Sequence, residues 1–296
     1  MKIFDCTTFY SEHMMMDVRF NILDKHVHKF IVVESLFSHS GKKKKLNFDI
    51  KNYPKFKDKI IYLVIEKEPE GIIYDDAIIN QAIKRQNSLK RISQSYDFMQ
   101  KGIESASQDD LILLSDNDEI PNLDSLKFKN SKYDLFIFKQ LFFYYKFDLL
   151  YDLLPWFGSK GCKKKKLKSF SWLKSIKNKK YPMWRLDCLF SKYKNINLEV
   201  INDGGWHFTN VKKPEDLYVK FKNFGHHDEF DISGITSNDI ERKIKDRKVF
   251  YNHFVDQSDP NKWNFDYSLK KIEKKLLPNY LNTHKDKYKE WFDEGK

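Results

Sequence analysis

The chain has 296 residues, of which 41% are hydrophobic and 32% charged, with 25 Phe and 16 Tyr. That length and composition are typical of a globular protein with a full core, and they exclude a disordered chain. The net charge of +12 suggests a nucleic-acid partner. However, only six of the 54 basic residues are arginine, the side chain that most often recognises base edges and phosphates in two-pronged contacts. We therefore expect no dedicated nucleic-acid partner.

The cysteines and the apolar stretches bear on the compartment. Cys6, Cys162 and Cys188 lack metal-ligand spacing, and an odd number of cysteines favours a reducing compartment. The first residues begin directly as a strand, without the pattern of a secretory signal. Charged residues interrupt the most apolar stretch, 135–157, well short of the ~20 apolar residues that cross a bilayer. We expect a soluble, cytoplasmic protein without a transmembrane segment.

The first half of the chain alternates strand and helix signals. Short apolar or β-branched runs predict strands at residues 2–5, 30–33, 60–65 and 111–114. Helical spacing predicts one helix over residues 14–23. It predicts a second, capped by Asp75 or Asp76, with an apolar stripe through Ile79, Ile83, Leu89, Ile92, Tyr96 and Met99. This alternation predicts a doubly wound α/β layer with a mostly parallel central sheet flanked by helices.

The second half is richer in aromatic residues. Residues 133–138 and 141–147 are predicted strands, and Pro155, Gly158 and Gly161 predict a loop that runs into the lysines at 163–166. Helices are predicted from Pro214, around Ile240 and Ile244, and over residues 269–277. Because there is no internal repeat and no clear linker, we expect a single domain, residues 1–296, with C-terminal helical segments.

Residues 111–121 carry the most specific local signal, Leu-Ile-Leu-Leu-Ser-Asp-Asn-Asp-Glu-Ile-Pro. The apolar strand ends in Asp116 and Asp118, at the edge where α/β proteins bind ligands. Alternate residues of an extended segment face the same way, so both carboxylates can turn toward one hard cation while Asn117 points elsewhere. The pattern resembles the Asp-x-Asp motif with which nucleotide-sugar transferases hold a divalent metal against a diphosphate. A surface turn rich in Asp and Asn is the alternative.

Six ordered blocks between residue 3 and about residue 230 resemble glycosyltransferase family 17. They are residues 4–12, 31–35, 41–48, 115–121, 204–209 and 224–230. The family includes the eukaryotic enzyme that adds the bisecting N-acetylglucosamine to N-glycans. The resemblance implies a GT-A-like fold and an inverting transfer, typically of N-acetylglucosamine from UDP-N-acetylglucosamine, that needs Mn²⁺ or Mg²⁺. Unlike the Golgi members, this chain has no visible anchor or luminal disulfide framework, so donor sugar and acceptor are less well implied than fold and metal.

The metal and donor residues follow from these two signals. Asp116 and Asp118 are the predicted metal ligands, and the resemblance adds His207 as a third ligand, with a hydrogen-bonded, semi-buried histidine as the alternative. The donor-binding candidates are Asp116 itself and Thr7, Glu34, Lys44, Arg85 and Asn87. Glu34 resembles the acid that contacts uracil or ribose, and Arg85 and Asn87 resemble the family's Gln-Arg-Asn segment. A capping carboxylate, a solvated helix face and a mobile surface lysine are the alternatives for Glu34, Arg85 and Lys44.

The acceptor side is less defined. Inversion in one displacement requires a base opposite the departing UDP, and the candidates are Asp203, Asp187 and Glu229, each of which also suits a turn or a salt bridge. Trp156, Trp184 and Trp206 are candidate platforms for the apolar faces of an acceptor sugar, with core packing as the alternative.

The whole chain is thus interpreted as a metal-dependent inverting glycosyltransferase. Its expected partners are a UDP-sugar donor and a glycan or glycoconjugate acceptor. Residues 1–125 are predicted to hold the nucleotide, and residues 126–296 the acceptor. Two alternatives stay open: a metal-dependent nucleotidyltransferase or phosphohydrolase that uses the same acids, and a non-enzymatic lysine-rich module that binds polyanions or membrane surfaces.

Overall fold

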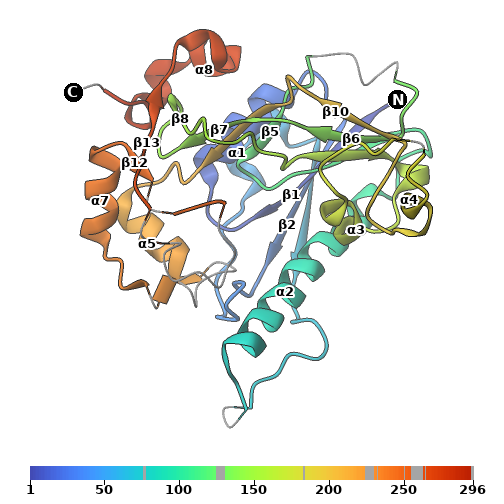
Figure 1. Cartoon of the computed structure of the whole chain (residues 1–296), viewed down its shortest axis with the longest axis horizontal. Helices are drawn as coiled ribbons and strands as arrows, with labels where there is room; N and C mark the ends of the chain where they lie inside the picture. Colours follow the sequence, from blue (N-terminus) through green and yellow to red (C-terminus); the bar gives the residue numbers. More distant parts are fainter. Residues whose placement is uncertain are drawn as a thin grey trace.

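The structure is a computed structural model that describes residues 1–75, 78–124, 131–182, 184–223, 230–231, 233–249, 251–254, 263 and 265–294. Figure 1 shows strands at the centre with helices around them. Within those ranges, no helix combines the length and the apolarity needed to cross a membrane.

A seven-stranded sheet combines four strands from residues 3–114 with three strands from residues 135–201. Its order is β10 (Leu198–Ile201), β6 (Leu135–Phe138), β9 (Lys160–Lys163), β4 (Leu111–Leu114), β1 (Ile3–Phe9), β2 (Lys29–Ser35), β3 (Ile60–Ile65). β4, β1, β2 and β3 are parallel neighbours, as the four apolar runs predicted. β9 is antiparallel to both β4 and β6. The α/β prediction is therefore confirmed, whereas the sheet is mixed and the expected mostly parallel arrangement is not confirmed.

The loop predicted after Pro155 is wrong at Lys160–Lys163, which form the strand β9. Gly161 lies opposite Leu113 of β4, and a Cβ at Gly161 would come within 2.8 Å of Leu113 Cδ2, so the glycine permits close strand pairing. The Lys160 side chain is buried, and its Nζ donates to the carbonyls of Lys174 and Ile176, each at 2.6 Å. Glycines and lysines suggest a loop locally. Here the neighbouring strands and two carbonyl acceptors stabilise a central strand instead.

Lys160 gives the protein a specific pH dependence. Burial, helped by the positive charge of Lys174, lowers the pKa of the Lys160 ammonium to about 7. Between pH 7 and about 10 the unfolded chain then binds more protons than the folded one, so the free energy of unfolding rises with pH. From pH 7 to 9.5 we expect a gain of about 3 kcal/mol in the wild type relative to Lys160→Met, measured by urea unfolding at both pH values. Parallel changes in the two proteins would contradict the assignment.

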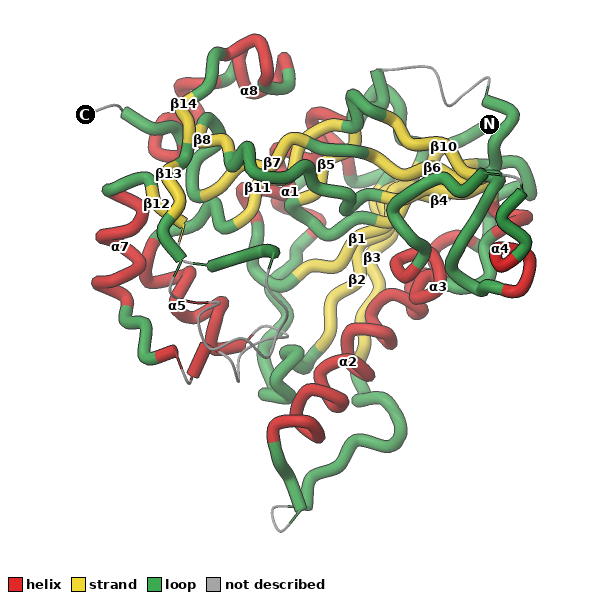
Figure 2. Tube along the Cα trace, viewed as in Figure 1, coloured by secondary structure: helices red, strands yellow, loops and turns green. Residues whose placement is uncertain are grey.

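A five-stranded sheet joins the motif loop to the second half of the chain. Its order is β14 (Lys270–Lys271), β8 (Leu149–Leu150), β7 (Leu141–Tyr144), β11 (Gly205–Thr209), β5 (Glu119–Pro121). β5 runs antiparallel to β11 and places Glu119 opposite His207. This register brings the 115–121 block and the 204–209 block together. A two-stranded sheet, β12 (Lys248–Val249) with β13 (Tyr267–Ser268), lies beside α7 (Ser237–Lys245) (Figure 2).

The remaining helices cover the sheets. They are α1 (His13–Leu23), α2 (Gln81–Asp97), α3 (Phe170–Ser175), α4 (Asp187–Phe190), α5 (Pro214–Asn223) and α8 (Asn279–Thr283), with 3-10 turns at Ile50–Asn52, Pro54–Phe56, Phe98–Ile103, Lys164–Lys166, Lys274–Leu276 and Lys285–Trp291. One apolar cluster joins the seven-stranded sheet to Phe98–Ile103 and α3, while another joins its opposite face to α1 and the C-terminal segment. α1, α5 and α7 confirm three predicted helices.

The apolar stripe predicted for α2 is only partly correct. The helix is capped by Asn80, whose side chain accepts the Ile83 N–H, and not by Asp75. Asp76 lies outside the described residues. Leu89 is 47% exposed, whereas the buried side chains of the helix are Asn87, Ser88, Arg91 and Ser95. The polar face of α2 is buried because its side chains bind neighbouring loops: Asn87 donates to the Ile73 carbonyl and Ser88 to the His39 carbonyl. The spacing of apolar residues in the sequence does not reveal such hydrogen bonds.

The helix predicted over residues 269–277 is wrong. Tyr267–Ser268 and Lys270–Lys271 form edge strands that pair with β12 and β8, and a 3-10 turn follows at Lys274–Leu276. Leu269 is buried between the two strands, although its spacing to later apolar residues suggested a helix face. Pairing with strands distant in sequence overrides the local periodicity here.

Candidate active site

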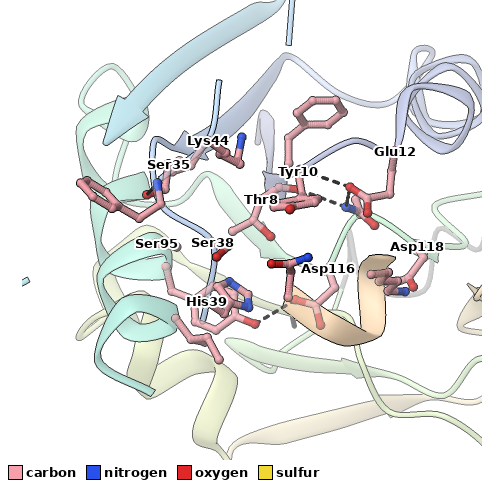
Figure 3. A pocket seen from close by; sticks show the side chains of 18 of the residues that line it. Thr8, Tyr10, Glu12, Ser35, Ser38, His39, Lys44, Ser95, Asp116 and Asp118 are labelled. Atoms are coloured by element: carbon pink, nitrogen blue, oxygen red, sulfur yellow. Dashed lines mark hydrogen bonds between the residues drawn. The ribbon is translucent and has the colours of Figure 1, made fainter. Parts of the chain in front are cut away.

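A cavity of about 320 Å³ opens where β1, β2 and β4 end. Ligand sites of parallel sheets lie at this carboxyl edge. Side chains from the ends of the three strands, from α2 and from α5 line it, namely Thr8, Phe9, Tyr10, Glu12, Val33, Ser35, Phe37, Ser38, His39, Lys44, Arg85, Ile92, Ser95, Tyr96, Asp116, Asn117, Asp118, Lys220 and Asn223. Figure 3 shows Asp116 with His39 on one side and Glu12 and Asp118 on the other.

A buried arginine holds the turn that carries the two aspartates. Arg19 of α1 forms a two-pronged ion pair with Asp5 of β1, with Nε 2.8 Å from Oδ2, and both side chains are fully buried. The same guanidinium donates to the carbonyls of Glu119 at 2.7 Å and Asp116 at 3.3 Å. Because the guanidinium is planar and rigid, it fixes the path of residues 116–119 relative to β1.

Glu119 supports the turn from its other side. Its buried carboxylate accepts the Asp116 N–H at 2.8 Å and the Trp156 indole N–H at 2.8 Å. A Cβ at Gly158 would lie 2.1 Å from Glu119 Cδ, so only glycine leaves room for this carboxylate. Glu119, predicted only as the end of a strand, therefore positions Asp116 and Trp156.

Asp116 is the more exposed aspartate of the pair. Its side chain is 39% exposed; Oδ1 accepts the Tyr96 hydroxyl at 2.9 Å, and Oδ2 lies 3.1 Å from Lys174 Nζ. Burial and the neighbouring Asp116 carboxylate raise the pKa of Tyr96, so its hydroxyl stays protonated and donates. Asp116 is thus held by α2 and α3 while it faces the cavity.

Asp118 is more buried and lies against His207. His207 Nε2 is 3.6 Å from Asp118 Oδ1, which is longer than a hydrogen bond. Burial opposes ionisation, but the charges of His207 and Lys220 outweigh it and hold the pKa of the Asp118 carboxyl well below its usual value. The imidazole is stacked on both Phe142 and Trp156, with ring centroids 4.7 Å and 4.4 Å away. Among the described residues, its buried Nδ1 finds no hydrogen-bond partner.

A second, smaller cavity of about 130 Å³ adjoins the first. The two share Glu12, Asp118 and Lys220 as walls. The Glu12 carboxylate accepts the Ser11 N–H at 3.0 Å and the Asn117 side-chain N–H at 2.9 Å, and it pairs with Lys212 at 3.3 Å. Burial raises the pKa of Glu12, but the opposing effect of the Lys212 and Lys220 charges is larger, so the pKa lies below its usual value. Asn117 faces the first cavity rather than pointing elsewhere.

The fold thus brings the 115–121 and 204–209 blocks together, and it places Asp116 and Asp118 on one cavity. The model of glycosyltransferase family 17 matches residues 1–291, essentially the whole chain. The chain belongs to this family. Comparison with curated proteins found no match. Family membership identifies a glycosyltransferase, so a sugar donor and an acceptor are its substrates, and the resemblance of the six blocks is confirmed.

The residues of this glycosyltransferase suit a divalent metal. Among the described residues, no three His, Cys, Asp or Glu side chains gather into a metal site of their own. Mg²⁺ is commonly bound by one or two carboxylates together with substrate phosphates and water, so a complete protein cage is not required. Asp116 and Asp118 supply two carboxylates on one cavity, and His207 Nε2 lies 3.6 Å from Asp118 Oδ1. The donor set therefore fits Mn²⁺ or Mg²⁺.

The predicted donor residues divide into two groups. Lys44 and Arg85 line the cavity of the glycosyltransferase. Glu34 does not line it: its buried carboxylate pairs with Lys44 and accepts the Asn47 and Phe48 N–H groups at 2.8 and 2.9 Å, which holds the loop after β2. Thr7 and Asn87 are buried and do not line the first cavity; Asn87 is hydrogen-bonded to the backbone of Ile73 and lines a separate cavity with it.

The predicted acceptor-side residues are dispersed. Asp203 is bonded to Asn122 at 3.0 Å and Asp187 pairs with Arg185 and Lys194, both outside the two cavities. Glu229 lies outside the described residues.

The three tryptophans are equally scattered. Trp156 stacks on His207 beside the motif turn. Trp206 donates its indole N–H to the Leu276 carbonyl at 2.7 Å, while Trp184 is exposed on the surface.

Several residues of the glycosyltransferase site were not predicted. Glu12 lies within the first matched block, and the sequence placed Tyr96 on the apolar face of the helix that is now α2. Lys174 and Lys220 resembled solvated lysines. His39 has no local signal: the hydroxyl of Ser88 and the guanidinium of Arg91, both on α2, fix its carbonyl at 2.9 and 3.2 Å. Burial lowers the pKa of the His39 imidazole to about 4 against the charges of Asp116 and Glu12, so the ring is neutral at pH 7.

Proposed function

We propose that the protein is a metal-dependent inverting glycosyltransferase that moves N-acetylglucosamine from UDP-N-acetylglucosamine to a glycan acceptor. The observation that carries the proposal is the meeting of Asp116 and Asp118 on one cavity at the carboxyl edge of β1, β2 and β4, in a chain of family 17. A GT-A-like fold is part of the proposal, supported by the four parallel strands that lead to this edge. The three unpaired cysteines support a reducing, cytoplasmic location.

The first cavity is the proposed donor site. Lys44, Arg85 and Lys220 line it and suit the negative charge of a diphosphate. Asp116 and Asp118, together with the donor phosphates and water, would hold Mn²⁺ or Mg²⁺, with His207 beside Asp118. The ion would supply positive charge to stabilise the departing diphosphate. The neutral His39 ring and the hydroxyls of Ser35 and Ser38 offer uncharged hydrogen-bonding groups for the nucleoside or the sugar.

The second cavity is the proposed acceptor site. It shares Asp118 and Glu12 with the first, so an acceptor bound there meets the donor sugar at their common wall. In a single displacement the acceptor oxygen bonds to the anomeric carbon, the bond to UDP breaks with its electron pair, and a base takes the hydroxyl proton. Asp216, in the first turn of α5, lines this second cavity and is the proposed base in place of Asp203. Glu12 suits the role less, because its oxygens are bonded and its pKa is lowered.

Asp216 and Asp203 can be separated by kinetics. We expect Asp216→Asn to keep UDP affinity and to lower kcat by about 100-fold or more, because general base catalysis is lost while donor contacts remain. Asp203→Asn is the matched control and should keep its turnover. Steady-state assays with varied acceptor, together with calorimetry of UDP binding, measure both effects. The reverse pattern would return the base to Asp203.

The activity itself is tested by incubating the protein with a panel of UDP-sugars, with and without Mn²⁺ and an acceptor glycan. We expect UDP release that needs the metal and rises when acceptor is added, with UDP-N-acetylglucosamine as the best donor. Release that ignores the acceptor would favour a phosphohydrolase. Binding that collapses with salt and ignores Asp116→Ala would favour a polyanion-binding module.

A further inference from the structure

The segment around α4 exposes large apolar side chains that do not belong to the two cavities. Trp184 is 76% exposed, Leu186 68% and Phe190 89%. Leu186 and Phe190 are four residues apart across one helical turn, so they project from the same side. Scattered apolar residues on a surface need no explanation, but three within seven residues form a patch of the kind that marks an interaction site.

Basic residues flank this patch in the chain. Residues 177–194 contain six Lys or Arg and one acid, Asp187. That acid is neutralised by Arg185 and Lys194, at 2.6 and 2.7 Å. The lysines at 177, 179, 180 and 192 are exposed. The exposed apolar side chains therefore lie in a strongly basic segment, which we term the basic-aromatic surface (residues 177–182 and 184–194).

We propose that the basic-aromatic surface docks the enzyme on a bilayer that contains anionic phospholipid. Exposed Trp, Leu and Phe side chains suit the boundary between headgroups and acyl chains, and lysines beside them are attracted to the negative surface of such a membrane. The net charge of +12 adds attraction over a longer range. The excess of exposed lysine in this segment complements a surface of many phosphates better than a protein partner of mixed charge.

The position of the surface leaves the proposed active site open. α4 lies at the edge of the molecule beside α3, whereas α5, which contributes Lys220 to the cavity, lies on the other side (Figure 1). Lys174 of α3 ion-pairs with Asp116, so α3 supports the proposed active site. The basic-aromatic surface begins two residues after the end of this helix. Docking through the basic-aromatic surface would hold the cavity near the membrane without covering it.

Vesicle flotation of the purified full chain tests the proposal. We expect the protein to float with phosphatidylcholine vesicles that contain phosphatidylglycerol, and to float far less with phosphatidylcholine alone or at high salt. The combined variant Trp184→Ser, Leu186→Ser, Phe190→Ser should bind at least about tenfold more weakly. Its melting temperature should match the wild type, because these side chains are exposed.

The matched control replaces exposed apolar residues elsewhere, with Ile78→Ser and Phe254→Ser, which are 54% and 62% exposed in the wild type. These changes should leave vesicle binding intact. The proposal is overturned if the wild type does not float with anionic vesicles, or if the triple variant floats as well as the wild type. It is equally overturned if the patch instead mediates self-association, seen as a wild-type dimer that the triple variant disrupts without any vesicle binding. None of these results depends on the donor or on glycosyl transfer.

Discussion

Replacing Asp118 by asparagine is expected to abolish Mn²⁺-dependent binding of UDP, with a loss of at least about 100-fold in affinity and of about 1,000-fold or more in turnover. Asparagine keeps the shape of the side chain but removes the negative charge that a divalent ion requires. Asp118 lines the cavity beside His207, and its carboxylate is ionised at neutral pH, as aspartates generally are. Calorimetric titration of UDP with and without Mn²⁺ measures the effect.

The fold of this variant should be retained, since asparagine keeps the size of the side chain and can still meet His207, whose Nε2 lies 3.6 Å from Asp118 Oδ1. Asp109→Asn is a suitable control, because Asp109 is 73% exposed, pairs with Lys165 and lies outside the cavity. It should bind UDP as the wild type does. Unchanged Mn²⁺-dependent UDP affinity in Asp118→Asn would remove the metal assignment while leaving the family membership intact.

Replacing Arg19 by methionine is expected to lower the free energy of unfolding by about 3–5 kcal/mol. Methionine fills most of the space but leaves the Asp5 carboxylate buried without its counter-ion, and it removes the donor to the carbonyls of Asp116 and Glu119. Donor affinity should fall as well, because the turn that carries both aspartates loses its anchor. Urea unfolding and UDP titration measure the two effects, and a loss of less than about 1 kcal/mol would contradict the argument.

The double variant Asp5→Leu, Arg19→Met separates stability from positioning. With both charges removed, no ion is left unpaired, so much of the lost stability should return. The carbonyls of Asp116 and Glu119 still lack their donor, so UDP affinity should stay low. If UDP affinity recovered together with stability, Arg19 would act through the buried charge alone and would have no separate role in positioning the turn.

The sequence by itself determined the parts of this protein that depend on neighbouring residues. The apolar runs of β3 and β4 were predicted with the observed bounds, and the abrupt change from Leu114 to Asp116 located the motif, because burial of a strand and exposure at its end follow from hydropathy along the chain. The ordered blocks around that motif indicated the family. Hydropathy and spacing are local properties, and they suffice for such elements.

Only the tertiary structure decided which side chains meet. Gly161 and the lysines at 160 and 163 gave no strand signal, yet β4 and β6 pair with this segment on both sides. Arg19 is an unremarkable residue of a helix in the sequence, but in the fold it joins Asp5 to the motif turn. Nothing in the sequence favours Asp216 over Asp203 or Asp187 as the base, and only the cavity walls distinguish them. Pairing, burial and charge neutralisation depend on residues far apart in the chain, so no local pattern records them.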